Sequence, residues 1–225
     1  MIGVGRIRGG ATGFVKQLQE ISRLRKLGYF MKAFRPGPGS KVLAVGVDPT
    51  GLHSFSNLVE YSYPYLESMV GLTNDLPDRW SKTDSPIRMV CGDGLRLPFR
   101  DNSFDICMSN AVVEHVGTRE EQRMFVEELC RVAPKVFVTT PNFFLPFELH
   151  TRLPLVHFLP GALRDAVLRR TGRQFWADNW GRRLNLLTAR QLRRLFPDWM
   201  DARVFGNRVT LMSESLVAIA RRKDA

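Results

Sequence analysis

The spacing of hydrophobic residues divides the chain into helix-like and strand-like segments that alternate along most of its length. Apolar side chains recur every three or four positions over residues 12–34, which predicts an amphipathic helix. The residues that form this repeat are Phe14, Val15, Leu18, Ile21, Leu24 and Leu27. The proline- and glycine-rich run at 35–40 then ends the predicted helix.

Short apolar runs with the length and composition of buried strands come next, and they occupy residues 42–45, 68–72, 87–91, 104–109 and 135–140. A helix or turn is expected at Phe55–Tyr65. The clearest helix follows the fourth strand, because Thr118 and Glu121 form a T-x-x-E capping box ahead of apolar residues at helical spacing. Pro134 marks its end.

The carboxyl-terminal part predicts two further helices and a strand pair. A short helix is expected at Gly161–Arg170, and Thr188 caps another that runs through Phe196 to Pro197. Strands at Ala202–Phe205 and Leu216–Ala220 lie close enough in sequence to pair as an antiparallel hairpin. Strands alternating with helices predict an α/β fold: a mostly parallel sheet covered on both faces and completed by this antiparallel pair.

The length of 225 residues suits one domain with additions. We assign residues 1–36 to an amino-terminal basic helix that decorates the fold, and residues 37–225 to the domain itself. Residues 141–187 are rich in proline, arginine and aromatic residues, and we interpret them as an insertion.

The formal charge of +11 is unevenly distributed. Basic residues outnumber acidic ones by 8 to 1 over residues 1–35 and by 10 to 3 over residues 151–200, whereas residues 36–150 carry 10 basic and 15 acidic ones. Basic flanks attract phosphate-bearing partners such as nucleic acid, anionic lipid headgroups or a phosphorylated substrate. The alternative interpretation is that these charges only keep the protein soluble.

The apolar stretches, the cysteines and the histidines indicate where the protein is located and whether it binds a metal. No apolar stretch approaches the ~20 residues of a membrane-spanning helix, and the first residues lack a signal-peptide pattern, so we expect a cytoplasmic protein. The cysteines Cys91, Cys107 and Cys130 are expected to be reduced, buried packing residues. The four histidines lack metal-ligand spacing, and we predict no metal.

Ligands of parallel α/β sheets bind beyond the carboxyl ends of the strands, so the residues that follow each strand carry the functional information. The loop after the first strand reads GVDPTG and offers Gly46, Asp48 and Gly51. Glycine there lets the backbone approach a cofactor closely. The nicotinamide fingerprint G-x-G-x-x-G is absent, which argues against a dehydrogenase.

Two segments after the third and fourth strands are more specific: GDGLRLPFRDNSFD at Gly92–Asp105 and SNAVVEH at Ser109–His115. Both resemble the corresponding motifs of the type 11 group of class I S-adenosylmethionine-dependent methyltransferases. Together with FVTTPN, HTRLPLVHFLP and LLTARQLRRLFP, the resemblance extends over about residues 41–220. It implies a Rossmann-like fold with a seven-stranded sheet, S-adenosylmethionine as cofactor, and methyl transfer as the activity.

The resemblance also implies roles for individual residues. Asp93 would bind the adenine amino group, with the Gly94 backbone against the ring. The other residues that it places at the cofactor are Gly46, Asp48, Gly51, Thr73, Asn74, Asn110 and Ala111. Glu114 and His115 would lie on the substrate side, where either is a candidate general base.

The cofactor motifs depart from the family pattern at two places. Ala44 stands where the first strand has an acidic residue, and the glycine loop carries Asp48 and Thr50 at later glycine positions. Thr73 and Asn74 replace the acidic residue that binds the ribose, although Asp75 could substitute. A non-catalytic relative on a degenerate methyltransferase fold therefore stays open as an alternative.

The acceptor is not named by any motif. We expect an oxygen-directed enzyme acting on a small or lipid-linked molecule, such as a saccharide or polyprenyl intermediate. The tetrad of base-amine methylases is missing after the fourth strand, which argues against methylation of adenine N6. The insertion mixes aromatic residues with arginines, which suits a substrate lid, peripheral contact with an anionic membrane, or an ordinary covering helix. His150 and His157 could line a substrate pocket. An RNA methyltransferase is the second alternative, although we judge a nucleic-acid partner less favoured.

Overall fold

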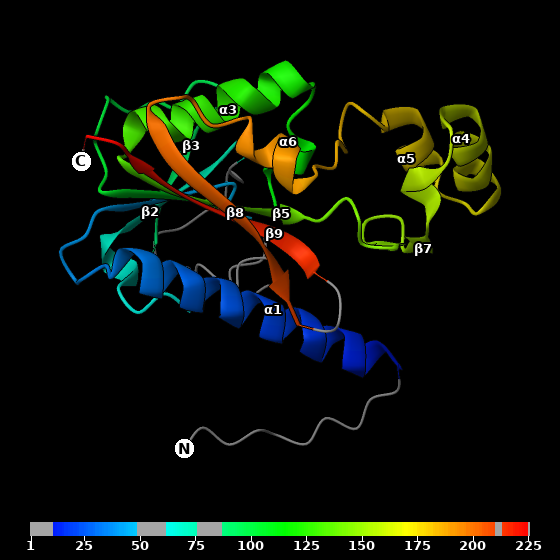
Figure 1. Cartoon of the computed structure of the whole chain (residues 1–225), viewed down its shortest axis with the longest axis horizontal. Helices are drawn as coiled ribbons and strands as arrows, with labels where there is room; N and C mark the ends of the chain where they lie inside the picture. Colours follow the sequence, from blue (N-terminus) through cyan, green and yellow to red (C-terminus); the bar gives the residue numbers. More distant parts are fainter. Residues whose placement is uncertain (1–10, 49–61, 76–86, 210–212, 225) are drawn as a thin grey trace.

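A computed structural model describes residues 11–48, 62–75, 87–209 and 213–224, and a seven-stranded sheet forms its centre (Figure 1). The strands are β1 (Val42–Val45), β2 (Met69–Thr73), β3 (Arg88–Cys91), β4 (Ile106–Asn110), β5 (Lys135–Pro141), β8 (Met200–Arg208) and β9 (Ser213–Arg222). Their order is β3-β2-β1-β4-β5-β9-β8. Strands β1 to β5 are parallel to one another, and β9 pairs antiparallel with both β5 and β8. The predicted sheet, including its antiparallel pair, is confirmed.

The chain reverses its direction of travel across the sheet between β1 and β4. From β1 it proceeds outward through β2 to β3, and it then returns to the other side of β1 to form β4 and β5. Sheets of this kind bind ligands in the crevice above such a reversal, at the carboxyl ends of the strands. The topology alone therefore places the site beyond Val45 and Asn110.

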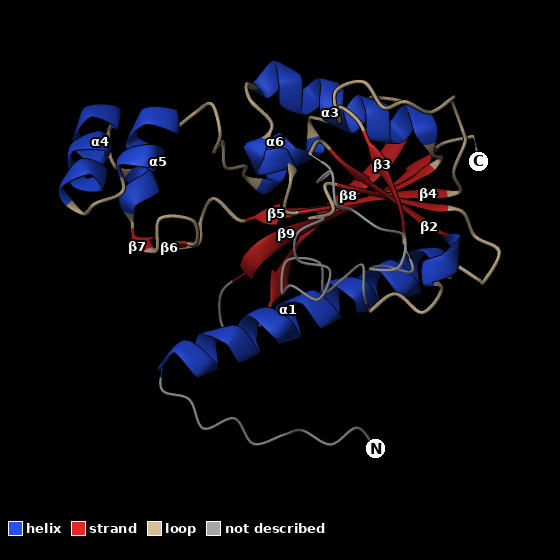
Figure 2. Cartoon of the chain, turned by 180° about the vertical axis from the view of Figure 1, so that it is seen from behind, coloured by secondary structure: helices blue, strands red, loops and turns tan. Residues whose placement is uncertain are grey.

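Helices cover both faces of the sheet (Figures 1 and 2). The long helix α1 (Ala11–Phe34) lies across one face, and α3 (Arg119–Val132) and α6 (Ala189–Arg193) lie on the other. Each face has its own buried cluster, since Phe30 and Phe34 of α1 pack with Phe137, while Leu129 and Val132 of α3 pack on the opposite side. Thr118 and Glu121 form the capping box expected at the start of α3.

The helix predicted near the amino terminus is confirmed, but it turns a different side to the sheet. Ile21 and Leu24 of the expected apolar stripe are 46% and 47% exposed. Ser22 and Phe30 are buried instead, and Asn207 of β8 donates from Nδ2 to the Ser22 hydroxyl at 2.9 Å. This buried polar contact fixes the rotation of the helix, which hydrophobic spacing alone could not reveal. Within the described chain, α1 supplies core residues as well as decorating the fold.

The insertion forms a separate small layer beside the sheet (Figure 1). It contains β6 (Phe147–Glu148), β7 (Leu153–Pro154), the 3-10 turn η4 (Val156–Phe158), α4 (Gly161–Arg170) and α5 (Gln174–Asn179). Val156, Leu168 and Ala177 form its own buried cluster, against which Trp176 and Trp180 pack. The β6–β7 pair and α5 were not predicted, because runs this short carry no periodic pattern.

Several element ends differ from the sequence-based expectation. The helix capped by Thr188 ends at Arg193 instead of Phe196, and β8 and β9 are longer than expected. The expectation that Cys91 is buried is wrong, because it lies exposed at the end of β3, an outer strand, whereas Cys107 and Cys130 are buried. The segment expected as a helix or turn at Phe55–Tyr65 lies largely outside the described residues. Among the helices that the structure describes, none combines the length and the apolar character needed to cross a membrane.

Candidate functional site

A pocket of about 580 Å³ opens at the carboxyl ends of β1, β2, β3 and β4. The predicted site residues that line it are Gly46, Asp48, Thr73, Asn74, Asp93, Gly94, Ala111 and His115. Asn110 and Glu114 do not line it, and Gly51 lies outside the described residues. The pocket also takes in Asp75, Val112, Gly117, Glu121 and Phe125. Loops that are distant in sequence thus converge where the fold topology places a ligand.

Gly46 occupies a position that only glycine fits. Its φ of +88° lies in the left-handed region, and a Cβ there would overlap Cγ2 of Val112 and lie 3.1 Å from Cγ1. The Gly46 N–H donates to the Leu72 carbonyl at 2.8 Å, which bends the chain away from β1 across the end of β2. The bare backbone forms one wall of the pocket, as expected for close approach to a cofactor.

Gly94 and Asp93 form the opposite wall. A Cβ on Gly94 would stand 2.8 Å from Cε2 of the buried Phe125 ring, so the backbone lies directly on that ring. The Asp93 Oδ1 accepts a hydrogen bond from the Leu95 N–H at 2.9 Å, and Oδ2 has no hydrogen-bond partner among the described residues. This arrangement presents an oriented, solvent-exposed carboxylate that can accept from an exocyclic amine.

At the end of β2, Thr73 lines the pocket but its side chain bonds within the fold. Its hydroxyl donates to the Asp75 carbonyl at 3.2 Å, and the residue is 4% exposed. Asn74 and Asp75 are exposed at the pocket. Of the residues at this end of β2, Asp75 is the one that presents a carboxylate to the pocket.

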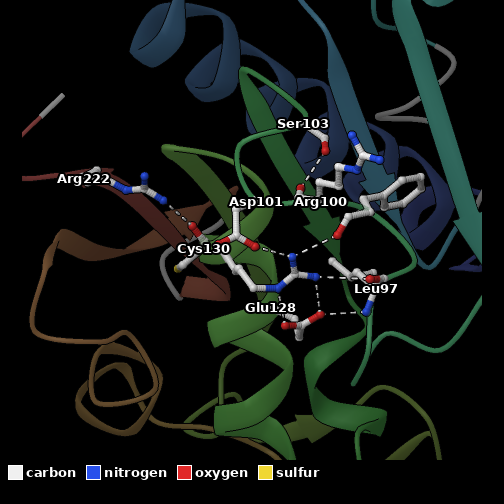
Figure 3. A network of polar contacts seen from close by, with 9 residues as sticks. Leu97, Arg100, Asp101, Ser103, Glu128, Cys130 and Arg222 are labelled. Carbon is white, nitrogen blue, oxygen red and sulfur yellow. Dashed lines mark hydrogen bonds and ion pairs between the residues drawn. The ribbon is translucent and has the colours of Figure 1, made fainter.

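A network of charged contacts fixes the segment that carries Asp93 and Gly94 (Figure 3). Arg131 of α3 pairs with Glu128 at 2.6 Å and with Asp101 at 2.7 Å, and it also donates to the Phe99 and Leu97 carbonyls. Glu128 in turn accepts from the Leu97 N–H at 2.7 Å. Since one guanidinium serves two carboxylates and two carbonyls, the loop between β3 and β4 is anchored to the helix beneath it.

At the carboxyl end of β4, the side chain of Asn110 bonds within the fold. Its Oδ1 accepts from the Thr139 hydroxyl at 2.7 Å and from Lys26 at 3.4 Å, so this side chain ties β4 to β5 and to α1. Ala111 lines the pocket with a φ of +56°, a strained conformation for a residue with a Cβ. Strain of this kind collects at functional sites, where the surroundings hold the backbone in place.

Glu114 and His115 point to different surroundings. Glu114 has no exposed surface, and its Oε2 accepts from the Thr140 hydroxyl at 2.9 Å. His115 is exposed at the pocket, and its Nδ1 lies 2.8 Å from the Arg183 carbonyl. A carbonyl only accepts, so Nδ1 carries the proton and Nε2 keeps its lone pair. His115 can therefore act as a base, whereas Glu114 does not face the pocket.

His150 brings the insertion into contact with this site. Its ring meets the His115 ring edge-on, with centroids 4.8 Å apart. His150 Nδ1 pairs with Glu148 at 2.7 Å. Burial alone would raise the pKa of Glu148, but hydrogen bonds from His150 and Thr151 outweigh it and lower the pKa to about 2. Glu148 is thus ionised and holds His150 at the seam between the insertion and the domain.

Comparison with known proteins agrees with the geometry. The family model described as a methyltransferase domain matches residues 37–135, the part of the chain that builds the pocket walls. A short segment is also similar to the probable tRNA methyltransferase 9B of Mus musculus, with 46% identity over 44 residues. That match spans 20% of this chain and only 10% of the mouse protein.

Solved structures share the fold at low sequence identity. The magnesium protoporphyrin IX methyltransferase of Synechocystis PCC 6803, solved with bound S-adenosylhomocysteine, has a TM-score of 0.56 and 16% identity, covering 98% of this chain and 90% of its own. The N-methyltransferase NodS of Bradyrhizobium japonicum WM9 has a TM-score of 0.51 and 14% identity, covering 89% and 95%.

The pocket itself fits the cofactor of this family. Two glycines whose Cβ atoms would meet neighbouring side chains line it, and an oriented carboxylate stands beside one of them. Asp93, Gly94, Gly46 and Asp75 are the residues that would hold S-adenosylmethionine. Together, the fold, the pocket and the matched domain support a class I S-adenosylmethionine-dependent methyltransferase.

Proposed function

We propose that this methyltransferase acts on an oxygen of a small molecule that carries a long apolar part, such as a lipid-linked saccharide or polyprenyl intermediate, and that it meets this substrate at an anionic membrane surface. The observation that carries the proposal is the surface of the insertion. Seven of the eleven large apolar side chains that are at least 37% exposed among the described residues lie in this segment: Phe144, Phe147, Leu149, Leu155, Phe158, Leu163 and Phe175.

Part of this apolar surface is continuous. The Phe143 ring contacts the rings of Phe144 and Phe158 at centroid distances of 5.5 and 5.2 Å. Exposed aromatic residues on a small layer that already has its own buried cluster are not needed to complete that cluster. Apolar surface of this kind is typical of contact with a membrane or an apolar ligand.

The charge of the insertion supports the same proposal. Residues 141–187 hold seven arginines and three acidic residues. Arg169 and Arg170 lie in the last turn of α4, and Leu163 is 53% exposed on the same helix. Anionic headgroups attract basic residues by about 1 kcal/mol each near the surface, which adds to the burial of apolar side chains.

The site offers the chemistry that an oxygen acceptor needs. S-adenosylmethionine supplies an electrophilic methyl group on a sulfonium centre. A hydroxyl becomes a better nucleophile as its proton leaves, and His115 Nε2 can take that proton because the Arg183 carbonyl holds the other nitrogen protonated. The edge-on contact with His150 places the insertion next to this base, so a substrate held by the insertion lies within reach of the pocket.

Two measurements test the proposal. The first is cosedimentation of the protein with vesicles of equal parts phosphatidylglycerol and phosphatidylcholine, compared with vesicles of phosphatidylcholine alone. The second is transfer of labelled methyl groups to polyprenyl-phosphate-linked sugars. Binding that requires the anionic lipid, together with labelling of the lipid-linked sugar, supports the proposal. Labelling of the free sugar alone contradicts the apolar part of the acceptor.

Matched variants test whether vesicle binding depends on the apolar side chains of the insertion or on exposed apolar side chains in general. Leu163→Ser combined with Phe175→Ser removes two exposed apolar side chains of the insertion, 53% and 54% exposed, and is expected to weaken vesicle binding about 10-fold or more. Met124→Ser, on α3 and 42% exposed, is the control and should leave binding unchanged. Equal effects of both changes would refute the role of the insertion.

An RNA substrate is the second candidate function. The local similarity to a probable tRNA methyltransferase favours it, and the fold is also shared with the small RNA methyltransferase HEN1 (TM-score 0.53, 16% identity), whose match covers 100% of this chain and 27% of that one. Binding of RNA whose affinity falls steeply with salt, together with methylation of that RNA, would favour this function over the first.

A further inference from the structure

The geometry points to a divalent transition-metal site of the zinc type, formed by Glu114, His115 and His150 at the seam between the domain and the insertion. One ligand atom from each of these residues lies within 4.8 Å of the other two. Sequence spacing gave no sign of this cluster, because two ligands follow β4 and the third comes from the insertion.

Glu114 supplies the first argument. Its side chain is fully buried, and Oε1 has no hydrogen-bond partner among the described residues, while Oε2 accepts from Thr140. A buried carboxylate oxygen without a partner is costly unless a cation or a donor completes it. Metal coordination by Oε1 would satisfy the one oxygen that the fold leaves open.

The two imidazoles supply the second argument. His115 Nδ1 lies 2.8 Å from the Arg183 carbonyl, and His150 Nδ1 lies 2.7 Å from Oε1 of Glu148. Each contact keeps the proton on Nδ1, so both rings retain the lone pair of Nε2 for an ion. Histidines that ligate metals are commonly held in this way by a carbonyl or a carboxylate behind the ring.

The donor set selects the type of ion. Two imidazoles and one carboxylate suit Zn²⁺ and its first-row neighbours, whereas Mg²⁺ and Ca²⁺ prefer oxygen ligands alone. Two ligand atoms bound at roughly 2.1 Å from one ion stand at most about 4.2 Å apart. Ligand atoms that are now as much as 4.8 Å apart would therefore move closer by roughly half an ångström or more when the ion binds. Three protein ligands leave at least one coordination position open.

The position of the cluster suggests what the ion does. His115 lines the cofactor pocket, so an open coordination position there lies next to the pocket. A hydroxyl bound there would lose its proton to solvent water more readily, because the ion would stabilise the resulting oxyanion. This role rests on the proposed function, and in the metal-bound protein His115 serves as a ligand and not as the base. Binding of the ion itself does not depend on the proposed function.

Titration of the metal-stripped full chain with Zn²⁺ by calorimetry tests the site directly. We expect one ion per chain at micromolar or tighter affinity, and a Co²⁺-loaded protein with the visible absorption of a low-coordinate cobalt centre. His150→Ala and His115→Ala should each weaken Zn²⁺ binding about 100-fold, and Glu148→Gln about 10-fold. The control is His157→Gln, because His157 belongs to the same insertion but lies outside the cluster.

The outcomes separate this inference from the proposed function. Absence of stoichiometric Zn²⁺ binding, equal loss in the His157→Gln control, or tighter binding of Mg²⁺ than of Zn²⁺ would each overturn the metal site. S-adenosylhomocysteine binding, measured on the same samples, reports whether the His150 and His115 variants keep the folded pocket. If Zn²⁺ binds as expected but no lipid-linked acceptor is methylated, the metal site stands and the proposed acceptor fails.

Discussion

Alanine at Gly46 is the sharpest test of the pocket geometry. Alanine there would have to adopt the φ of +88° that Gly46 has, and its Cβ would overlap the Val112 side chain. A left-handed conformation costs an alanine roughly 1–2 kcal/mol, and overpacking adds about 1–3 kcal/mol. Gly46→Ala should therefore lower the free energy of unfolding by about 2–5 kcal/mol, a large share of the ~5–15 kcal/mol that holds such a domain together.

A double mutant divides this loss into its two causes. Val112→Ala alone should cost about 1 kcal/mol, because Val112 is only partly buried. In the double variant the overlap between the new Cβ and Val112 disappears, but the backbone strain at position 46 remains. The loss in the free energy of unfolding should therefore be about 1–3 kcal/mol smaller than the sum of the losses of the two single variants. Urea unfolding followed by circular dichroism measures all three values.

The control is Gly28→Ala on α1, where a Cβ would meet nothing within 4 Å. Because glycine is a poor helix former, this change should raise stability by roughly 0.5–1 kcal/mol. If the effects of Gly46→Ala and Val112→Ala simply add, or if Gly46→Ala behaves like Gly28→Ala, the proposed contact between the two residues is refuted.

Three further predictions follow from contacts in the structure. Asp93→Ala should weaken S-adenosylhomocysteine binding about 10-fold or more in calorimetry, since the oriented carboxylate is lost; an unchanged affinity would exclude it from the site. Asn207→Ala should cost about 1–3 kcal/mol in urea unfolding, because it leaves Ser22 buried without this donor; a neutral result would show that the contact does not hold α1. Hydrogen bonding to Arg131 lowers the pKa of Glu128 from 4.5 and outweighs the burial that raises it. Its stabilising effect is therefore present above about pH 4.5 and lost as the pH falls below that value, so unfolding curves of Glu128→Gln should depend less on pH there.

The strands and the cofactor walls could be predicted because each depends on local sequence. The apolar run at Val42–Val45 and the capping box at Thr118 specify their elements without help from distant residues. Gly46 could be assigned from its place after the first strand, since the carboxyl ends of parallel strands meet at one edge, whereas the role of Gly94 is implied by the resemblance to the methyltransferase motifs.

Other features depend on contacts that a single sequence does not display. The buried side of α1 follows from the Ser22–Asn207 contact, and the turning of Asn110 toward Thr139 follows from the pairing of β4 with β5. The Glu114, His115 and His150 cluster arises only when the insertion folds back beside β4. The spacing of the histidines along the sequence does not predict that these residues come close together.

The position of α1 has a consequence for how the protein folds. Ser22 bonds to Asn207 across 185 residues of sequence, Arg25 donates to the Arg208 carbonyl across 183, and Arg221 donates to the Ala33 carbonyl across 188. Contacts between segments so distant raise the contact order of the chain, which slows folding because long loops must close before these contacts form. Until β9 has paired with β5, and β8 with β9, the side of α1 that bears Phe30 lacks much of the surface it finally covers. We therefore expect slow refolding, with a transient tendency to aggregate while that face of the helix is exposed.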